Sequence, residues 1–267
     1  MCKRKRVSGL GSSVQHLPAS GGNWKLVGVK TIAVIPARLA STRLPRKMLR
    51  EIVGKPLIGW TYEAVRSSPL LTDVIVATDS QEILDACRDN GWKAQLTSPT
   101  HSSGTGRVHE ISNSVTADVY INVQGDEPLV RPQHIDMLFR IMQDSAVSVG
   151  TLKTPCPAEE IHNPNAVKVV TAADGRALYF SRSTIPFDRD GKQPAYFKHL
   201  GLYAYRKPAL DFFVKQQESS LEMSERLEQL RFLENGMSIY VAETPHDSIG
   251  VDTEDDLQRV AAILGQR

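Results

Sequence analysis

The segment Val119-Tyr120-Ile121-Asn122-Val123-Gln124-Gly125-Asp126-Glu127-Pro128 changes from apolar to acidic within a few residues. Its apolar, β-branched first half predicts a buried strand. Gly125 permits a sharp turn and Pro128 ends strand pairing, so Asp126 and Glu127 should lie at the carboxyl end of that strand. Ligands of open α/β sheets bind at this end, and a carboxylate there can hold Mg²⁺ together with phosphate oxygens. Taken alone, the segment fits a surface turn with two solvated acids equally well.

Short apolar strands alternate with helices in the first half of the chain. Strands are predicted at residues 31–36 and 73–78, and a helix opens near Pro56. Asp79 is expected to cap the next helix with Glu82 as its capping-box partner, and Gly91 to end it. This alternation predicts an α/β fold with a largely parallel sheet flanked by helices.

Strands follow strands in the second half, which predicts a smaller antiparallel β extension. The β signals cover residues 146–152, 177–182 and 199–205, residues 163–170 are read as a turn followed by a strand, and a last strand is expected at 238–242. A helix is expected from Ser224 to Glu234. Its Glu228-Gln229 pair is either a solvated face or a ligand contact.

The loop that follows the first strand is strongly basic. Between Ala37 and Lys47 it carries four cations and two hydroxyl groups and no acid. Arginine forks, a lysine point charge and hydroxyl donors suit a phosphate, and the loop's place after the first strand favours a phosphate cradle over a merely solvated basic loop. The later segment from His101 to Arg107 is a weak motif because it lacks a Walker ending and a third dinucleotide glycine. It is expected to be a flexible loop that lets Arg107 reach a base or a phosphate.

A second candidate acid stands near the end of the chain. Asp252 follows Gly250 and comes one residue before Thr253, which with Asp256 predicts a helix cap. Asp252 either favours the helix dipole or, if the fold brings it to Asp126, completes a pair for Mg²⁺. Sequence spacing leaves both readings open.

The bulk composition is that of an ordinary globular protein. The chain has 267 residues, 41% hydrophobic and 23% charged, with a net charge of +2, which gives no support for a nucleic-acid partner. Its three distant cysteines predict reduced thiols in a cytoplasmic protein, and no apolar run is long enough for a membrane span. Residues 1–28 are basic and free of acids, and are expected to be a disordered extension rather than a transit peptide, leaving 29–267 as the folded domain.

Nine segments, in order, resemble the 3-deoxy-manno-octulosonate (Kdo) cytidylyltransferases, also called CMP-Kdo synthetases. They are IPARLASTRLPRK, VATD, HSSGTGR, NVQGDEP, NPNAVKVV, ALYFSRSTIPFDRD, HLGLYAYR, LEQLR and GVDTEDDL. The resemblance as a whole covers residues 31–264. The resemblance implies a nucleotidyltransferase-type fold and a homodimer. It implies that CMP passes from CTP to Kdo, with release of pyrophosphate, for lipopolysaccharide synthesis.

The resemblance also implies roles for individual residues. Asp126 and Asp252 would bind Mg²⁺. The triphosphate would lie on Arg38, Ser41 and Lys47, the cytidine side on Arg107, Gln124 and Gly125, and the sugar on Arg182, His199, Tyr203, Glu228 and Gln229.

Two positions depart from the family pattern. Arg46 stands where a glycine commonly precedes the lysine of the basic loop, and Gly106 stands where an acid usually precedes Arg107. Two alternatives stay open beside Kdo transfer: cytidylyl transfer to another acidic keto-sugar, or a catalytically silent nucleotide sensor on the same fold.

Overall fold

The computed structural model describes residues 28–41 and 43–266. Within these residues the centre is a nine-stranded mixed sheet. Seven strands run in the order β11-β7-β10-β6-β1-β4-β5; β8 pairs with β10, and β9 pairs with β8. The strands are β1 Thr31–Ala37, β4 Asp73–Thr78, β5 Ala94–Leu96, β6 Val119–Asn122, β7 Val149–Pro155, β8 Lys168–Thr171, β9 Ala177–Ser181, β10 Phe197–Tyr205 and β11 Tyr240–Glu243.

The first half of the chain forms the parallel part of the sheet. β1 pairs in parallel with β4 on one side and β6 on the other, and β4 pairs in parallel with β5. Parallel neighbours need crossover connections, and helices supply them. These helices are α1 Leu57–Arg66, α2 Gln81–Asp89 and α3 Gly104–Ser114, after a short β2–β3 ribbon of Glu51–Ile52 and Lys55–Pro56. The predicted α/β class and the strands at 31–36 and 73–78 are confirmed.

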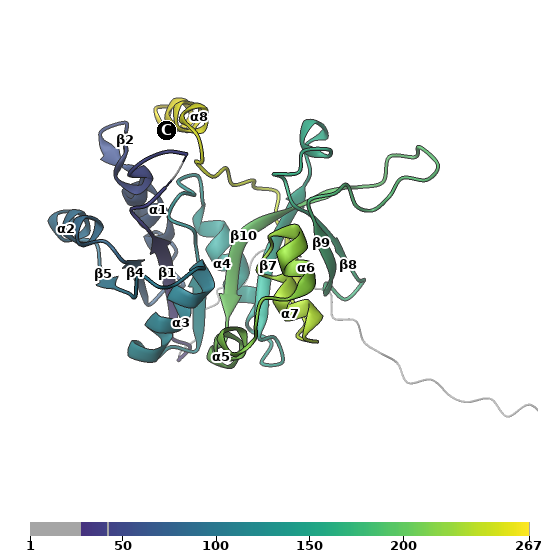
Figure 1. Cartoon of the computed structure of the whole chain (residues 1–267), viewed down its shortest axis with the longest axis horizontal. Coiled ribbons are helices and arrows are strands. Elements are labelled where there is room, and N and C mark those ends of the chain that lie inside the picture. Colours follow the sequence, from purple (N-terminus) through teal and green to yellow (C-terminus); the bar gives the residue numbers. More distant parts are fainter. Residues whose placement is uncertain (1–27, 42, 267) are drawn as a thin grey trace, which may run out of the picture.

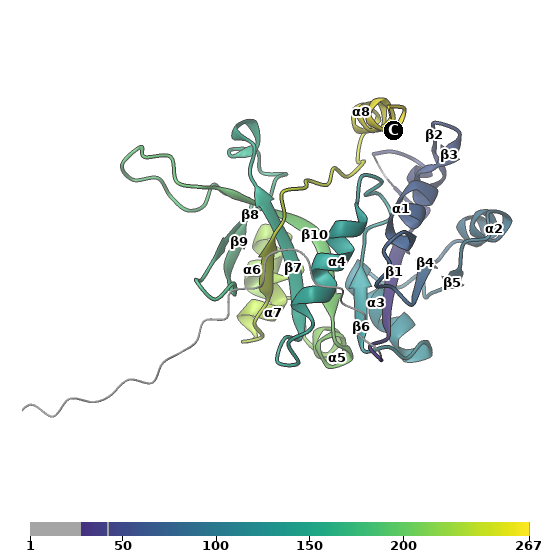
Figure 2. The same cartoon turned by 180° about the vertical axis from the view of Figure 1, so that it is seen from behind.

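Side chains of β1 alternate between two hydrophobic clusters, because successive strand residues point to opposite faces. Ala33 and Ile35 join the cluster under α1, α2 and α4 (Pro132–Ile141), whereas Ile32 and Val34 join the one under α3 and α5 (Lys207–Lys215). Figure 1 and Figure 2 show the sheet between these helices from opposite sides. Burial on both faces explains why the strand is a continuous apolar run.

The predicted antiparallel extension is confirmed in the β8–β9 pair, which is antiparallel and joins the sheet through β10. β10 itself lies inside the main sheet, antiparallel to both β6 and β7. Its register shifts between Leu200 and Tyr203, an irregularity centred on Gly201. The antiparallel strands are therefore continuous with the parallel half and do not form a separate subdomain.

The chain ends with α8, Glu254–Leu264, which lies beside α1 and the β2–β3 ribbon (Figure 2). Thr253 caps it, accepting a hydrogen bond from the Asp256 amide while the Asp256 carboxylate accepts one from the Thr253 amide. The predicted cap is confirmed. Leu257 and Val260 pack in a third cluster with Leu44 and Leu57, so α8 fixes residues 248–252 near the basic loop.

Several local predictions are wrong. Ser80, and not Asp79, caps α2, because the Ser80 hydroxyl accepts the Ile83 amide while Asp79 pairs with Arg107. The segment from His101 to Arg107 is not one loop, since α3 begins at Gly104 under a Ser103 cap.

The helix expected from Ser224 to Glu234 is broken in two. α6, Ser220–Glu225, ends at Arg226 in the left-handed conformation (φ 55°), and α7 covers Leu230–Glu234. The break places Glu228 and Gln229 in a turn. The strand predicted from residue 146 begins only at Val149.

The extension expected over residues 1–28 falls almost wholly outside the described residues, and it stays a prediction. Within residues 28–41 and 43–266 no helix combines the length and the hydropathy needed to cross a bilayer.

Candidate active site

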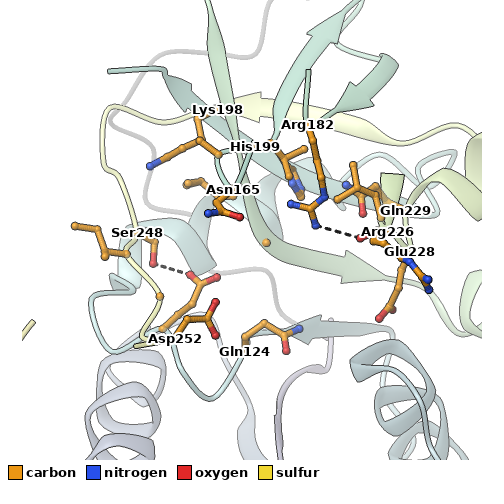
Figure 3. Close-up of a pocket in the computed structure, with 18 of the residues that line it drawn as sticks. Gln124, Asn165, Arg182, Lys198, His199, Arg226, Glu228, Gln229, Ser248 and Asp252 are labelled. Carbon is orange, nitrogen blue, oxygen red and sulfur yellow. Dashed lines mark hydrogen bonds between the residues drawn. The ribbon is translucent and has the colours of Figure 1, made fainter. Parts of the chain in front are cut away.

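A cavity of about 750 Å³ opens at the carboxyl end of β6, between the two halves of the sheet (Figure 3). It lies where parallel strands meet the antiparallel β10, which is where ligands of open α/β sheets are expected. Most of its wall is polar. Seven residues expected from the sequence line it: Gln124, Arg182, His199, Tyr203, Glu228, Gln229 and Asp252.

Asp126 and Asp252 meet at one edge of this cavity, on the ammonium group of Lys47. Lys47 Nζ lies 2.6 Å from Asp126 Oδ2 and 3.0 Å from Asp252 Oδ1. Arg43 adds a contact of 3.0 Å to the other Asp252 oxygen. Burial would lower the pKa of Lys47, but the two carboxylates raise it above its usual value, so the group is a cation. The fold therefore brings together the two acids that the sequence singled out.

Main-chain contacts hold this arrangement. The Val251 amide donates to the Asp126 carbonyl at 2.9 Å. This bond holds the segment before α8 against the β6–α4 turn. Gly125 is closely packed: a Cβ there would come within 3.0–3.1 Å of Ile58, Met48 and the Pro36 carbonyl. The glycine is thus required for packing, and its predicted place along the cytidine stays a prediction.

The carboxylate pair fits Mg²⁺ in its donor chemistry. Two oxygens from different carboxylates already converge on one positive charge. Within the described part of the chain no three His, Cys, Asp or Glu side chains gather as a metal cage. Mg²⁺ is commonly held by one or two carboxylates with substrate phosphates and water completing its shell, so a pair suffices.

The basic loop borders a second hollow of about 510 Å³, lined by Ser41, Pro45 and Arg46 together with Asp79 and Ser80 from the end of β4. Arg38 is exposed at the start of the loop. Arg46 takes the left-handed conformation with φ 55°, which L-residues other than glycine adopt only at an energetic cost. This gives a physical reason for the glycine that the family resemblance implies at this position.

Arg107 is placed differently from its predicted role. It is buried on α3, and its guanidinium pairs with Asp79 and donates to Thr97 Oγ1 at 2.8 Å and to the Ser98 carbonyl at 3.2 Å. The side chain ties α3 to the ends of β4 and β5. It lines neither hollow, so its contact with the nucleotide stays a prediction that this geometry does not favour.

The far side of the large cavity is built from β10 and the α6–α7 turn. His199 lies 3.0 Å from Thr151 Oγ1, and burial lowers the pKa of His199 to about 3, so the ring is neutral. Tyr203 Oη and Gln229 Nε2 are buried with no hydrogen-bond partner in the described chain. Because buried polar groups are normally paired, these two atoms indicate a polar ligand. Burial also raises the pKa of Glu228, which accepts a hydrogen bond of 3.0 Å from Thr105.

Arg182 holds the α6–α7 turn in place. Its guanidinium donates to three main-chain carbonyls, those of Glu225 at 2.6 Å, Pro164 at 3.0 Å and Arg226 at 3.3 Å. Figure 3 shows Arg182 beside Arg226 at the wall of the cavity. If Arg182 also binds the sugar carboxylate in a bidentate manner, as predicted, the same guanidinium group must serve both that carboxylate and the three main-chain carbonyls.

Sequence reasoning missed a polar wall on the opposite side of the cavity. Ser248 donates to Glu127 Oε2 at 2.6 Å, and Lys198 donates to Glu160 and Asp247 at 2.7 Å each. Burial raises the pKa of Glu127 to about 7. The one hint in the sequence that Glu127 belongs to the site is its position directly after Asp126.

The described fold and site are those of a nucleotidyltransferase. The family model for cytidylyltransferases matches residues 32–239. A 3-deoxy-manno-octulosonate cytidylyltransferase of Koribacter versatilis is 67% identical, with 94% of this chain and 97% of that protein covered. Another from Acidobacterium capsulatum is 54% identical, with 90% and 98% covered. A solved CMP:2-keto-3-deoxy-manno-octonic acid synthetase complexed with CTP superposes with a TM-score of 0.86 at 43% identity, covering 89% of this chain and 99% of that one.

A putative glucose-1-phosphate thymidylyltransferase from Bacillus anthracis shares the fold alone, with a TM-score of 0.63 at 14% identity over 87% of this chain and 94% of that one. The chain belongs to the cytidylyltransferase family, and within it to the 3-deoxy-manno-octulosonate cytidylyltransferases.

Proposed function

We propose that this protein transfers CMP from CTP to the anomeric hydroxyl of Kdo and releases pyrophosphate. The observation that carries the proposal is the meeting of Asp126 and Asp252 on Lys47, at the edge of a cavity lined by polar and charged side chains. Its close relatives carry the name of this activity, and the similar solved structure is a complex with CTP.

The triphosphate of CTP would lie on the basic loop, near Arg38, Ser41 and Lys47. Arginine and lysine neutralise phosphate charge, and the Ser41 hydroxyl can donate to a phosphate oxygen. Gln124 lines the large cavity beside the acid pair and would face the nucleotide. Transfer at the α-phosphorus forms a bond to the sugar oxygen and breaks the bond to pyrophosphate. Such a displacement depends mainly on alignment and charge neutralisation, and both are tasks for these residues.

Asp126 and Asp252 would hold Mg²⁺. Bound there, the metal would neutralise phosphate charge and lower the pKa of the attacking hydroxyl. A metal bound between the two carboxylates would take over the position of the Lys47 ammonium group. Lys47 would then be able to donate to the triphosphate, which is the role that the family resemblance implies for it.

The sugar would occupy the cavity between β10 and the α6–α7 turn. Tyr203 Oη and Gln229 Nε2, which have no partner in the described chain, would bond its hydroxyl or carboxylate oxygens. The neutral ring of His199 can do the same without adding charge. Arg182 would orient the turn and complete the neutralisation of the sugar carboxylate.

Pyrophosphate release tests the proposal. CTP, Mg²⁺ and Kdo together should give CMP-Kdo and pyrophosphate, and leaving out any one should abolish release. Release with a sialic acid or an amino-Kdo in preference to Kdo would redirect the assignment to another acidic keto-sugar. Binding of CTP without release would support a silent sensor. The homodimer and the cytoplasmic location implied by the family stay predictions; light scattering measures the first.

A further inference from the structure

Glu127 lies in the large cavity but has no part in the site as proposed so far. It extends from the β6–α4 turn, one residue after Asp126, and lines the cavity together with Gln124 and Ser248. In Figure 3, Ser248 and Asp252 lie on the side of the cavity opposite Glu228 and Gln229. Because Ser248 donates a hydrogen bond to Glu127, Glu127 belongs to that same side of the cavity.

The two oxygens of this carboxylate have different surroundings. Oε2 accepts the hydrogen bond from Ser248 Oγ at 2.6 Å. No hydrogen bond from the described residues reaches Oε1. That oxygen faces β10 at Gly201, where an added Cβ would lie 3.3 Å from Oε1 and, apart from residues 200–202, within 4 Å of no other atom of the described residues. Gly201 thus leaves open space in front of one oxygen, while Ser248 fixes the other.

An anchoring role alone does not account for Glu127. The segment from Thr244 to Asp252 is already held by the Val251–Asp126 main-chain bond and by the pair between Asp247 and Lys198. Glu127 is only partly buried, and its Oε1 stays accessible from the cavity without a hydrogen-bond partner among the described residues. Such an oxygen is suited to a ligand that brings hydroxyl donors.

We propose that Glu127 Oε1 accepts a hydrogen bond from a non-reacting hydroxyl of the acceptor sugar, and that Ser248 orients the carboxylate for this contact. The inference rests on the proposed function, since it assigns the opposite wall of the same sugar pocket. Glu127 thereby becomes a determinant of sugar specificity. A good acceptor must place a hydroxyl group within hydrogen-bond distance of Oε1, and an analogue that lacks this hydroxyl leaves Oε1 without a partner.

Steady-state kinetics of three variants test this. Glu127→Gln removes the charge but keeps the shape, and should raise the KM for Kdo by roughly 10- to 100-fold, with the KM for CTP little changed. Gly201→Ala places a methyl group against Oε1 and should raise the same KM while Glu127 remains. Ser248→Ala should have a smaller effect in the same direction. Glu159→Gln, an exposed carboxylate-to-amide change, serves as the control and should behave as wild type.

Kdo analogues that each lack one ring or side-chain hydroxyl separate a contact from general damage. For one analogue the wild type should already show the weakened KM, and Glu127→Gln should add nothing to it. Equal loss from Glu127→Gln with every analogue, or an unchanged KM for Kdo in Glu127→Gln, would overturn the inference. If wild-type protein forms no CMP-sugar at all, the proposed function fails instead. Melting temperatures near wild type exclude misfolding as the cause of any loss.

Discussion

Lys47 Nζ lies 2.6 Å from Asp126 Oδ2, although the two residues are 79 positions apart in the sequence, and the same nitrogen contacts Asp252 Oδ1 at 3.0 Å. A buried ammonium group thus stands between two acids that come from the β6–α4 turn and from the residue before the α8 cap. In the proposed function a metal takes the place of that charge between the carboxylates.

The first prediction concerns that ammonium. Lys47→Met removes the cation that the two carboxylates share, while Arg43 stays beside Asp252. It should lower the free energy of unfolding by about 1–3 kcal/mol in the absence of metal, less than for a fully buried pair because both acids are partly exposed. Thermal melts with and without Mg²⁺ measure this. Mg²⁺ should raise the melting temperature of the variant more than that of wild type, and an equal rise in both would contradict the shared site. The KM for CTP should also rise far more than that for Kdo.

The second prediction concerns Arg182. Lysine keeps the charge but cannot reach three carbonyls and a sugar carboxylate at once. Arg182→Lys should therefore weaken Kdo binding by roughly 1–3 kcal/mol and leave CTP binding little affected. The KM values for the two substrates report this directly. Unchanged Kdo kinetics would assign the sugar carboxylate to another cation of the cavity, such as Arg226 or Arg259.

The third prediction follows from His199, whose pKa burial lowers to about 3 in the folded protein from an ordinary value of 6.5. Below pH 6.5 the unfolded chain binds a proton that the folded chain refuses, so stability should fall as the pH drops from 6.5 towards 3. Above pH 6.5 His199 should have no effect. His199→Gln should flatten this part of the stability profile in denaturant titrations. A profile with the same slope in both proteins would show that folding does not lower the pKa of His199.

The fourth prediction concerns the strained residue of the basic loop. Arg46→Gly should raise the free energy of unfolding by up to about 1 kcal/mol, because relief of the left-handed conformation exceeds the entropy that glycine loses. Arg46→Ala is the matched control: it removes the exposed pair with Glu82 but keeps the strain, and it should not stabilise. Equal stability of the two variants would show that the left-handed backbone is not the cause.

The alternation of apolar strands and helices was sufficient to predict the fold class, since strands such as β1, buried on both faces, are read directly from their composition. The residues that cap helices were harder to predict from the sequence. Asp79 and Ser80 are both good capping residues, and the choice depends on Arg107, which reaches Asp79 from α3. The break between α6 and α7 could not be predicted from the sequence. Residues Ser224 to Glu234 have helical periodicity, and arginine is not a residue type that indicates the left-handed backbone found at Arg226.

Some residues of the candidate site could likewise be predicted from the sequence, and others could not. Asp126 and Asp252 were both predicted because each follows a strand and a glycine, but only the fold shows that they meet. Glu127 received no role because its partner, Ser248, is 121 positions away. Arg107 was placed near the nucleotide from its motif, whereas its partners at Thr97 and Asp79 come from other elements. Long-range contacts of this kind leave no local pattern in a single sequence.

The acid pair itself gives the most direct test of the account. Asp126→Asn and Asp252→Asn keep size and lose charge, and each should lower the turnover of CMP-Kdo formation by orders of magnitude at saturating CTP, Kdo and Mg²⁺ while the protein stays folded. The control is Glu254→Gln, an exposed acid two residues beyond Asp252 that pairs with Arg50, and it should retain full turnover.

The decisive measurement is the turnover of the double variant beside the two single ones. If Asp126 and Asp252 act as one unit, the double variant should be little slower than either single variant, because groups that act together are strongly non-additive. Losses that multiply in the double variant, or a single variant with near wild-type turnover, would contradict a shared metal site.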